Sequence, residues 1–242
     1  MSNKSAVIVG VGASRGLGAA VARRFAREGF RLVLLGRNGD KLNATAKELK
    51  DGGAFVDGVV GDVTDAGLVG RVVMAAEAHG PLEAAVFNAG GNWPKPFLDM
   101  DAKFFEDMWR VNAFAGFTFA QAVLRTMVAR KRGTLIFTGA SASLRGRTNF
   151  AGFASAKAAL RAVAQSAARE FGPHGIHVAH VIVDGMIDGE RINTFLPQAK
   201  EQRGPDGLLD PDAIAENYWM LHTQARNAWT HEIDVRPWVE TW

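Results

Sequence analysis

The stretch AVIVGVGASRGLGAA, residues 6–20, decides the fold. Its first five residues predict a buried strand, and a helical pattern begins among Gly12, Gly16 and Gly18. Glycine at such a junction lets the backbone turn tightly, and the free N–H groups of a helix start attract a phosphate. A plain tight turn is the simpler explanation. The position between the first strand and the first helix favours a dinucleotide site, although the spacing G-x-x-x-G-x-G differs from G-x-G-x-x-G.

The rest of the chain repeats this alternation of strand and helix. Continuous apolar runs, each followed by a helical pattern, indicate parallel strands that are buried on both faces. The order predicts an α/β fold with a doubly wound parallel sheet, in a single domain that spans residues 1–242. The expected strands cover residues 6–10, 31–36, 54–60, 84–90, 133–139, 177–183 and 232–237.

Two segments near the carboxyl end depart from the simple alternation. Residues 184–210 form one long irregular stretch, and loops of that length are usually lids, substrate loops or disordered segments. We expect a substrate loop. Residues 211–242 are rich in tryptophan, which is enriched at interfaces, so this tail is expected to help form a homodimer or homotetramer. Extra core under the last strand is the alternative for its tryptophans, which are Trp219, Trp229, Trp238 and Trp242.

Composition narrows the functional class. A chain of 242 residues with 48% hydrophobic content can bury one sizeable core. The net charge is +3 without a run of Lys or Arg, which argues against a nucleic-acid or lipid-binding arm and for a small anionic ligand. The absence of cysteine excludes disulfides and a thiolate nucleophile, and no apolar run approaches a membrane span. The six histidines show no metal-ligand spacing. We therefore expect a cytoplasmic protein that acts on a small molecule, with no metal, nucleic acid or membrane partner.

The end of the second expected strand bears on the choice of cofactor. A carboxylate there would accept a hydrogen bond from the adenosine ribose and would repel a 2′-phosphate. The chain has Gly36 and Arg37 instead, and Arg15 lies within the glycine segment. Guanidinium groups bind phosphate through charge-assisted, bidentate hydrogen bonds. These residues predict NADP(H) in preference to NAD(H), although either arginine could be an ordinary surface residue.

Five motifs in order resemble those of the short-chain dehydrogenase/reductase family, and the resemblance covers essentially the whole chain. VGASRGLG resembles the family's T-G-x-x-x-G-x-G, with Val11 at the threonine position. GDV (61–63), FNAG (87–90), VNAFAG (111–116) and FASAK (153–157) resemble the motifs that follow. The resemblance implies a Rossmann-type fold and cofactor contacts from Gly12, Ser14, Arg15, Gly16, Leu17, Gly18, Arg37, Asp62, Val63, Asn88, Ala89, Gly90, Lys157 and Gly185.

The catalytic residues that the resemblance implies are incomplete. In the family a tyrosine transfers the proton, a lysine lowers its pKa and holds the nicotinamide ribose, a serine polarises the carbonyl, and an asparagine anchors a water chain. Asn112 and Lys157 match this pattern. The tyrosine position carries Phe153, which has no proton to give, and the serine position carries Ala140.

Other groups are candidates for the lost roles. Ser141 follows the serine position directly and is predicted to replace it, while the possibility that Ser141 and Ser143 are mere loop hydroxyls stays open. Asp184 follows the sixth expected strand, where ligands bind in such folds, but a role in a helix cap or loop is the commoner one. Tyr218 lies on a late helix that in the family packs away from the nicotinamide.

Three functional classes follow. The first is an NADP(H)-dependent oxidoreductase that transfers hydride to or from a small carbonyl or alcohol, with a substitute proton donor or water. The second is a catalytically silent NADP(H)-binding protein, a sensor or the inactive partner in an assembly. The third is a non-redox enzyme that uses the same pocket. A positioned general acid is worth about 10²–10⁴ in rate, so its loss slows the reaction without abolishing it.

Overall fold

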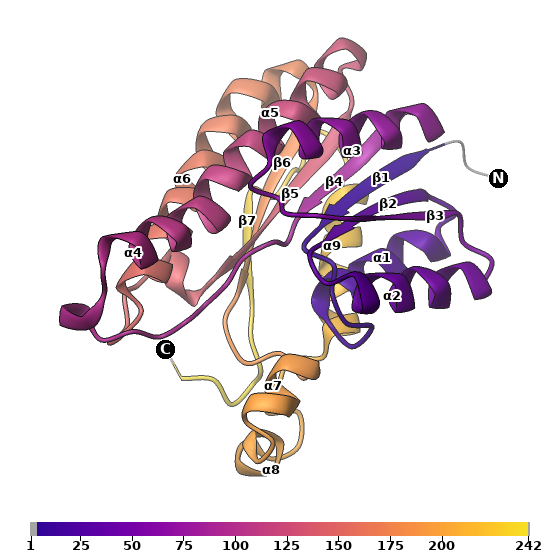
Figure 1. The fold of residues 1–242 in the computed structure, drawn as a ribbon. Helices are drawn as coiled ribbons and strands as arrows, with labels where there is room; N and C mark the ends of the chain where they lie inside the picture. The colour runs from indigo at the N-terminus through magenta and orange to yellow at the C-terminus, as the bar shows by residue number, and fades with distance from the viewer. Residues whose placement is uncertain (1–3, 242) are drawn as a thin grey trace.

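The computed structural model describes residues 4–241 and contains, within them, one seven-stranded sheet in which every pair of neighbours is parallel (Figure 1). The strand order is β3-β2-β1-β4-β5-β6-β7, so the direction of winding reverses between β1 and β4. This order confirms the predicted doubly wound α/β fold. The strands are β1 (Ser5–Val9), β2 (Arg31–Gly36), β3 (Val56–Val60), β4 (Leu82–Phe87), β5 (Gly133–Ala140), β6 (Ile176–Val183) and β7 (Glu232–Val235).

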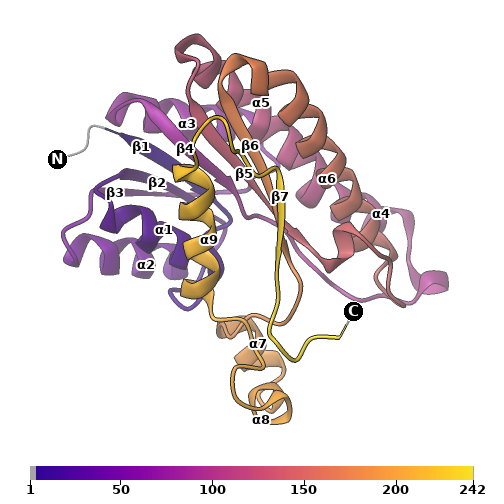
Figure 2. The ribbon, with the colours of Figure 1, turned by 180° about the vertical axis from the view of Figure 1, so that it is seen from behind.

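Helices cover both faces of the sheet, which explains the unbroken apolar strands. In β1, Ala6 and Ile8 join one hydrophobic cluster, whereas Val7 and Val9 join the other, because successive side chains of a strand point to opposite faces. Figure 2 shows α1, α2 and α9 on one side and α3, α5 and α6 on the other. The helices are α1 (Leu17–Arg27), α2 (Gly39–Asp51), α3 (Ala66–His79), α4 (Ala102–Trp109), α5 (Ala115–Met127), α6 (Ala151–Phe171), α7 (Glu190–Phe195), α8 (Ala199–Arg203) and α9 (Pro211–Thr223).

Local sequence signals set several helix ends. The side chain of Asn38 accepts a hydrogen bond from the Lys41 N–H at the start of α2, and Asp210 caps α9 directly before Pro211. Between α4 and α5 the chain makes a π-helical turn, η2 (Arg110–Phe114), which contains Asn112. Such turns are rare and are often found at functional sites. Shorter turns are η1 (Phe97–Asp99), η3 (Val128–Arg130), η4 (Ser141–Ser143) and η5 (Gly172–His174).

Residues 184–210, which we expected to be irregular, contain the short helices α7 and α8. Both lie outside the layers, at the bottom of Figure 1. The two ends of this segment are joined by a β-bridge between Ile187 and Leu209, and the Asp188 N–H donates to the Leu209 carbonyl over 2.8 Å. Helices this short show no clear apolar period, so the sequence pattern did not indicate them.

The tryptophans of the tail differ in their exposure. Trp219 meets Phe25 edge-to-face with ring centres 5.4 Å apart, and Trp229 stacks on His177 at 4.9 Å. Both side chains are half-buried, and Trp219 packs against one of the two hydrophobic clusters. Trp238 is 80% exposed, and Trp242 lies outside the described residues. Within residues 4–241, no helix is long and apolar enough to cross a membrane.

Candidate active site

The glycine segment packs closely against the end of β4, at the point where the strand order reverses. Gly10 has φ +85°, and a Cβ there would lie 2.4 Å from the Ala89 nitrogen. The Asn88 Nδ2 atom donates to the Gly10 carbonyl over 3.1 Å. A Cβ on Gly18 would lie 2.7 Å from that same carbonyl oxygen, so α1 can start here only because position 18 is glycine. Crevices at this position bind ligands in open α/β sheets.

A cavity of about 250 Å³ lies in this crevice. A Cβ on Gly12 would meet no atom of the described chain within 4 Å, so the space beside this residue is open. Gly16 precedes α1 in an extended conformation, and no side chain of the described residues caps that helix end. Its N–H groups can therefore receive an anion such as a pyrophosphate. The cavity is lined by Gly10, Val11, Gly12, Leu35, Gly36, Arg37, Asn38, Gly61, Val63, Asn88, Ala89, Gly90 and Val111.

One end of this cavity carries the residues expected to meet the adenosine. Arg37 is exposed and lines the cavity at the end of β2. Burial acts to raise the pKa of the neighbouring Asp62, but two hydrogen bonds from Thr64 and the charge of Arg37 outweigh it and lower that pKa. Gly36 is obligatory, because a Cβ there would lie 2.0 Å from the Val11 carbonyl oxygen. The structure thus brings Gly36, Arg37, Asp62 and Val63 together at this end of the cavity.

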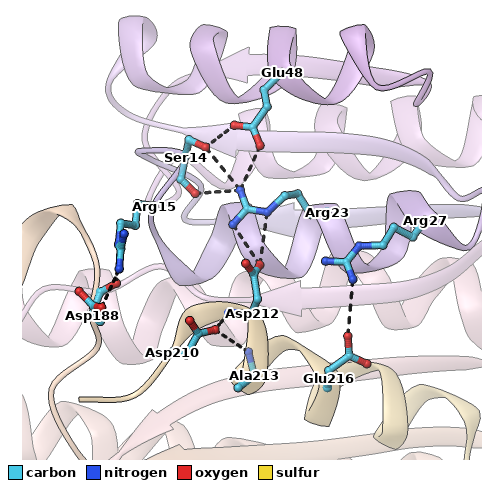
Figure 3. Close-up of polar contacts among 10 residues, drawn as sticks. All are labelled: Ser14, Arg15, Arg23, Arg27, Glu48, Asp188, Asp210, Asp212, Ala213 and Glu216. Carbon is cyan, nitrogen blue, oxygen red and sulfur yellow. Dashed lines mark hydrogen bonds and ion pairs between the residues drawn. The ribbon is translucent and has the colours of Figure 1, made fainter. Parts of the chain in front are cut away.

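Ser14 and Arg15 differ from the expectation that both are open to the cofactor (Figure 3). The Ser14 hydroxyl donates to the Glu48 carboxylate on α2. The Arg15 guanidinium forms an ion pair with Asp188, with 2.6 Å between Nη2 and Oδ2, and donates from Nε to the Asp188 carbonyl over 3.1 Å. In this conformation Arg15 therefore binds residues 184–210, and the two predicted arginines do not both present free guanidinium groups at the cavity.

The catalytic helix of the resemblance is α6. Phe153 and Lys157 share one face of it, with 5.9 Å between the Lys157 Nζ atom and the centre of the Phe153 ring. Lys157 is buried, and its Nζ donates to the Thr138 carbonyl over 2.7 Å. Burial lowers the pKa of this lysine from 10.5 to about 8. An ammonium group with such a pKa can release a proton near neutral pH.

Asn112 and Gly90 complete this end of the site. The π-helical turn buries Asn112, whose Nδ2 donates to the Met108 carbonyl over 2.9 Å. Its Oδ1 atom is buried and has no hydrogen-bond partner in the part of the chain that the structure describes. A Cβ on Gly90 would lie 2.6 Å from that oxygen and 3.5 Å from Lys157 Nζ. The three residues therefore pack closely together, and they bring an ammonium donor and an unpaired acceptor next to the cavity that Gly90 lines.

The two candidate serines lie in different surroundings. Ser141 begins η4 and is partly exposed, whereas Ser143 is buried. The Ser143 Oγ atom accepts from the Ala140 N–H over 3.2 Å and lies 3.5 Å from His180 Nε2. His180 Nδ1 lies 2.9 Å from a carboxylate oxygen of Glu232. Burial is the main cause that lowers the pKa of His180 to about 4, so the imidazole is neutral near pH 7. The sequence did not indicate this chain of contacts, since its members come from three separate elements.

The other candidate donors are engaged in structural contacts. Asp184 is 1% exposed, and both of its carboxylate oxygens accept from Arg145, over 3.1 and 3.2 Å. Tyr218 is fully buried, its hydroxyl lies 2.7 Å from Thr138 Oγ1, and burial raises its pKa. Gly185 has φ +157°, and a Cβ there would lie 2.7 Å from the ring of Pro237. Among residues 4–241, no group of three His, Cys, Asp or Glu side chains could hold a metal ion.

Comparison with known proteins identifies the relatives of this chain. The family model described as short chain dehydrogenase matches residues 5–198. A solved short-chain dehydrogenase from Rhodopseudomonas palustris is 37% identical, with a TM-score of 0.84 over 98% of this chain and 100% of that one. The 3-oxoacyl-[acyl-carrier-protein] reductase MabA of Mycobacterium bovis is 33% identical over 82% of this chain and 74% of its own.

A third relative was solved with a cofactor derivative. The alcohol dehydrogenase of the archaeon Thermococcus sibiricus, complexed with 5-hydroxy-NADP, is 28% identical, with a TM-score of 0.85 over 98% of both chains. The family match covers most of the chain and agrees with the strand order and the crevice described above. The chain therefore belongs to the short chain dehydrogenase family of oxidoreductases.

Proposed function

We propose that this protein is an NADP(H)-dependent oxidoreductase that interconverts a small carbonyl compound and its alcohol without a tyrosine. The observation that carries the proposal is the close packing of Gly90, which lines the open crevice, against the buried side chains of Asn112 and Lys157. Burying a lysine is costly, so a buried lysine beside an unpaired amide oxygen supports a retained site for a polar ligand at this end of the crevice.

The residues of the crevice fit a dinucleotide. The start of α1 beside Gly12 would take the pyrophosphate, Asp62 and Val63 would hold the adenine, and Arg37 would bind a 2′-phosphate. Lys157 and Asn112 would meet the nicotinamide riboside end. When bound, the nicotinamide supplies or accepts the hydride. The relative from T. sibiricus carries an NADP derivative, which supports this choice of cofactor.

Lys157 is the proton source in this proposal. Its ammonium is the titratable donor at this end of the crevice whose pKa lies near neutrality, at about 8. Phe153 lacks the phenol hydroxyl of the family, and a water molecule in place of that hydroxyl would pass the proton from Lys157 Nζ to the substrate oxygen. Ser141, at the start of η4, is the candidate for polarising that oxygen in place of Ala140.

A second function is favoured by the same two substitutions. With Phe153 at the tyrosine position and Ala140 at the serine position, the chain lacks both the phenol and the hydroxyl of the family. A protein that only binds NADP(H) would tolerate both changes. Such a protein would act as a sensor or as the inactive partner of an active relative.

Incubation of the protein with NADPH or NADH and a broad panel of aldehydes and ketones separates the two functions. The oxidoreductase consumes NADPH with at least one compound, faster than NADH, and Lys157→Met abolishes the consumption. A silent binding protein binds NADPH tightly and consumes none of it with any member of the panel.

A further inference from the structure

Two cations at the rim of the crevice are held by acidic residues of the 184–210 segment. Arg15 pairs with Asp188 over 2.6 Å, as Figure 3 shows, and the Lys41 ammonium contacts the Glu190 carboxylate. The partners are 173 and 149 residues apart in the sequence. Both ion pairs therefore connect the segment that carries α7 and α8 to the elements that build the cofactor crevice.

Lys41 lies on the face of α2 that packs against the glycine segment. Thr45, one turn further along, donates from Oγ1 to the Gly12 carbonyl over 3.0 Å. Glu48, the next residue on that face, contacts Ser14. Positions 41, 45 and 48 share one side of a helix, so Lys41 projects beside the same glycine segment, one turn nearer to Arg37. Lys41 therefore lies at the end of the crevice where a 2′-phosphate would bind.

The contacts of Asp188 extend beyond Arg15. Asp188 also accepts from Lys200 over 2.9 Å and from Asn193 over 3.0 Å, which ties it to both α7 and α8. The backbone of the segment also contacts the glycine loop, since the Glu190 N–H donates to the Arg15 carbonyl over 2.9 Å. A Cβ on Gly189 would lie 2.7 Å from that carbonyl oxygen, so the segment rests directly on the glycine loop.

We propose that Lys41 joins Arg15 and Arg37 in binding the 2′-phosphate of NADP(H), and that Asp188 and Glu190 hold two of these cations until the phosphate displaces them. The inference rests on the proposed function and adds a coupling to it. The phosphate and the two carboxylates repel each other and compete for the same cations, so binding of the phosphate releases the 184–210 segment from the crevice rim. NADH has no phosphate at that position and leaves the ion pairs intact.

Coupling of this kind is reciprocal: if the bound phosphate opens the ion pairs, then removal of the ion pairs must strengthen phosphate binding. The double variant Asp188→Asn with Glu190→Gln should bind NADPH at least fivefold more tightly than the wild type, with NADH affinity unchanged. Lys41→Gln should weaken NADPH binding at least fivefold and leave NADH binding unchanged. Asp212→Asn is the matched control, since Asp212 pairs with Arg23 beside the same loop and with neither Arg15 nor Lys41.

Limited trypsin digestion of the wild-type protein gives an independent readout. Cleavage after Lys200 and Arg203 should be faster with saturating NADPH than with saturating NADH. The single variant Glu190→Gln replaces a side chain that is 44% exposed, and it is used if the double variant does not fold.

The outcomes separate this inference from the proposed function. Equal affinity of the wild type for NADPH and NADH overturns the proposed cofactor preference. A wild type that prefers NADPH, with variants of unchanged affinity and equal cleavage under both cofactors, overturns the coupling alone. Tighter NADPH binding in the acid-to-amide variants, with faster cleavage under NADPH in the wild type, supports it.

Discussion

Restoring the two lost hydroxyls should restore a fast reaction. The change is Phe153→Tyr combined with Ala140→Ser, which returns a phenol to α6 and a hydroxyl to the end of β5. Phe153 is only partly buried, so its ring position can accept an oxygen without overpacking the core. We expect NADPH-dependent reduction of a small aldehyde or ketone at a rate about 10²–10⁴ above that of the wild type, the usual contribution of a positioned acid.

The geometry of α6 gives the size of the effect on the new phenol. The Lys157 ammonium lies 5.9 Å from the ring centre. If the phenolate oxygen lies at about that distance from the ammonium, two unit charges attract by about 3 kcal/mol at an effective dielectric constant of about 20, which lowers the pKa of the phenol by about 2 from its usual value of about 10. A phenol with a pKa near 8 is an effective acid close to neutral pH.

The assay follows NADPH absorbance with the carbonyl panel for the wild type, the double variant and a control. Phe171→Tyr is the matched control, because it adds the same hydroxyl at the far end of the same helix. Adding Lys157→Met to the double variant should remove the gain. If the double variant folds, binds NADPH and still consumes no more of it than the wild type, the substrate pocket has diverged beyond these two positions and the reasoning fails.

Three further predictions follow from particular residues. Arg37→Asp should reverse the cofactor preference, from at least tenfold tighter binding of NADPH, about 1.4 kcal/mol, to tighter binding of NADH; unchanged affinities in a fluorescence titration would refute the role of Arg37. The protein should form a homodimer or homotetramer through residues 211–242, and a monomeric mass by light scattering, the same after deletion of residues 238–242, would refute this. The pKa of His180 is lowered to about 4 in the folded protein, from 6.5. Its contribution to stability is therefore complete above pH 6.5 and is lost as the pH falls toward 4, by up to about 3 kcal/mol. His180→Gln should flatten that pH dependence in denaturant titrations, whereas His174→Gln on the surface should not.

The sequence predicted the fold well because its signals are local. Each strand is a continuous apolar run followed by a helical pattern, and all seven expected strands are present with ends shifted by a few residues. The largest shift concerns β4, expected at 84–90 and found at Leu82–Phe87. Residues 88–90 lie beyond the end of the strand. There the side chain of Asn88 donates a hydrogen bond to the Gly10 carbonyl, which follows β1.

The relative positions of site residues could be predicted only where the residues belong to one short motif. The glycine segment and the pair Phe153 and Lys157 are such cases, since a turn or a helix fixes their relative positions. The ion pair of Arg15 with Asp188 spans 173 residues, and the contacts of Ser143 with His180 depend on the pairing of the elements. α7 and α8 are held by such tertiary contacts rather than by their own periodicity, so the sequence pattern did not indicate them either.

The pH dependence of carbonyl reduction tests the central claim most directly, that a protein of this family without a catalytic tyrosine uses Lys157 as its proton source. The measurement follows NADPH consumption with the best substrate of the panel, across a pH range that spans the Lys157 pKa of about 8. Reduction requires the ammonium form, so the rate should be constant well below that value and should fall about tenfold per pH unit above it. Lys157→Met should lose both the rate and the titration. A profile that is flat through pH 8, a rate that survives Lys157→Met, or tight NADPH binding with no consumption by the wild type would contradict the claim.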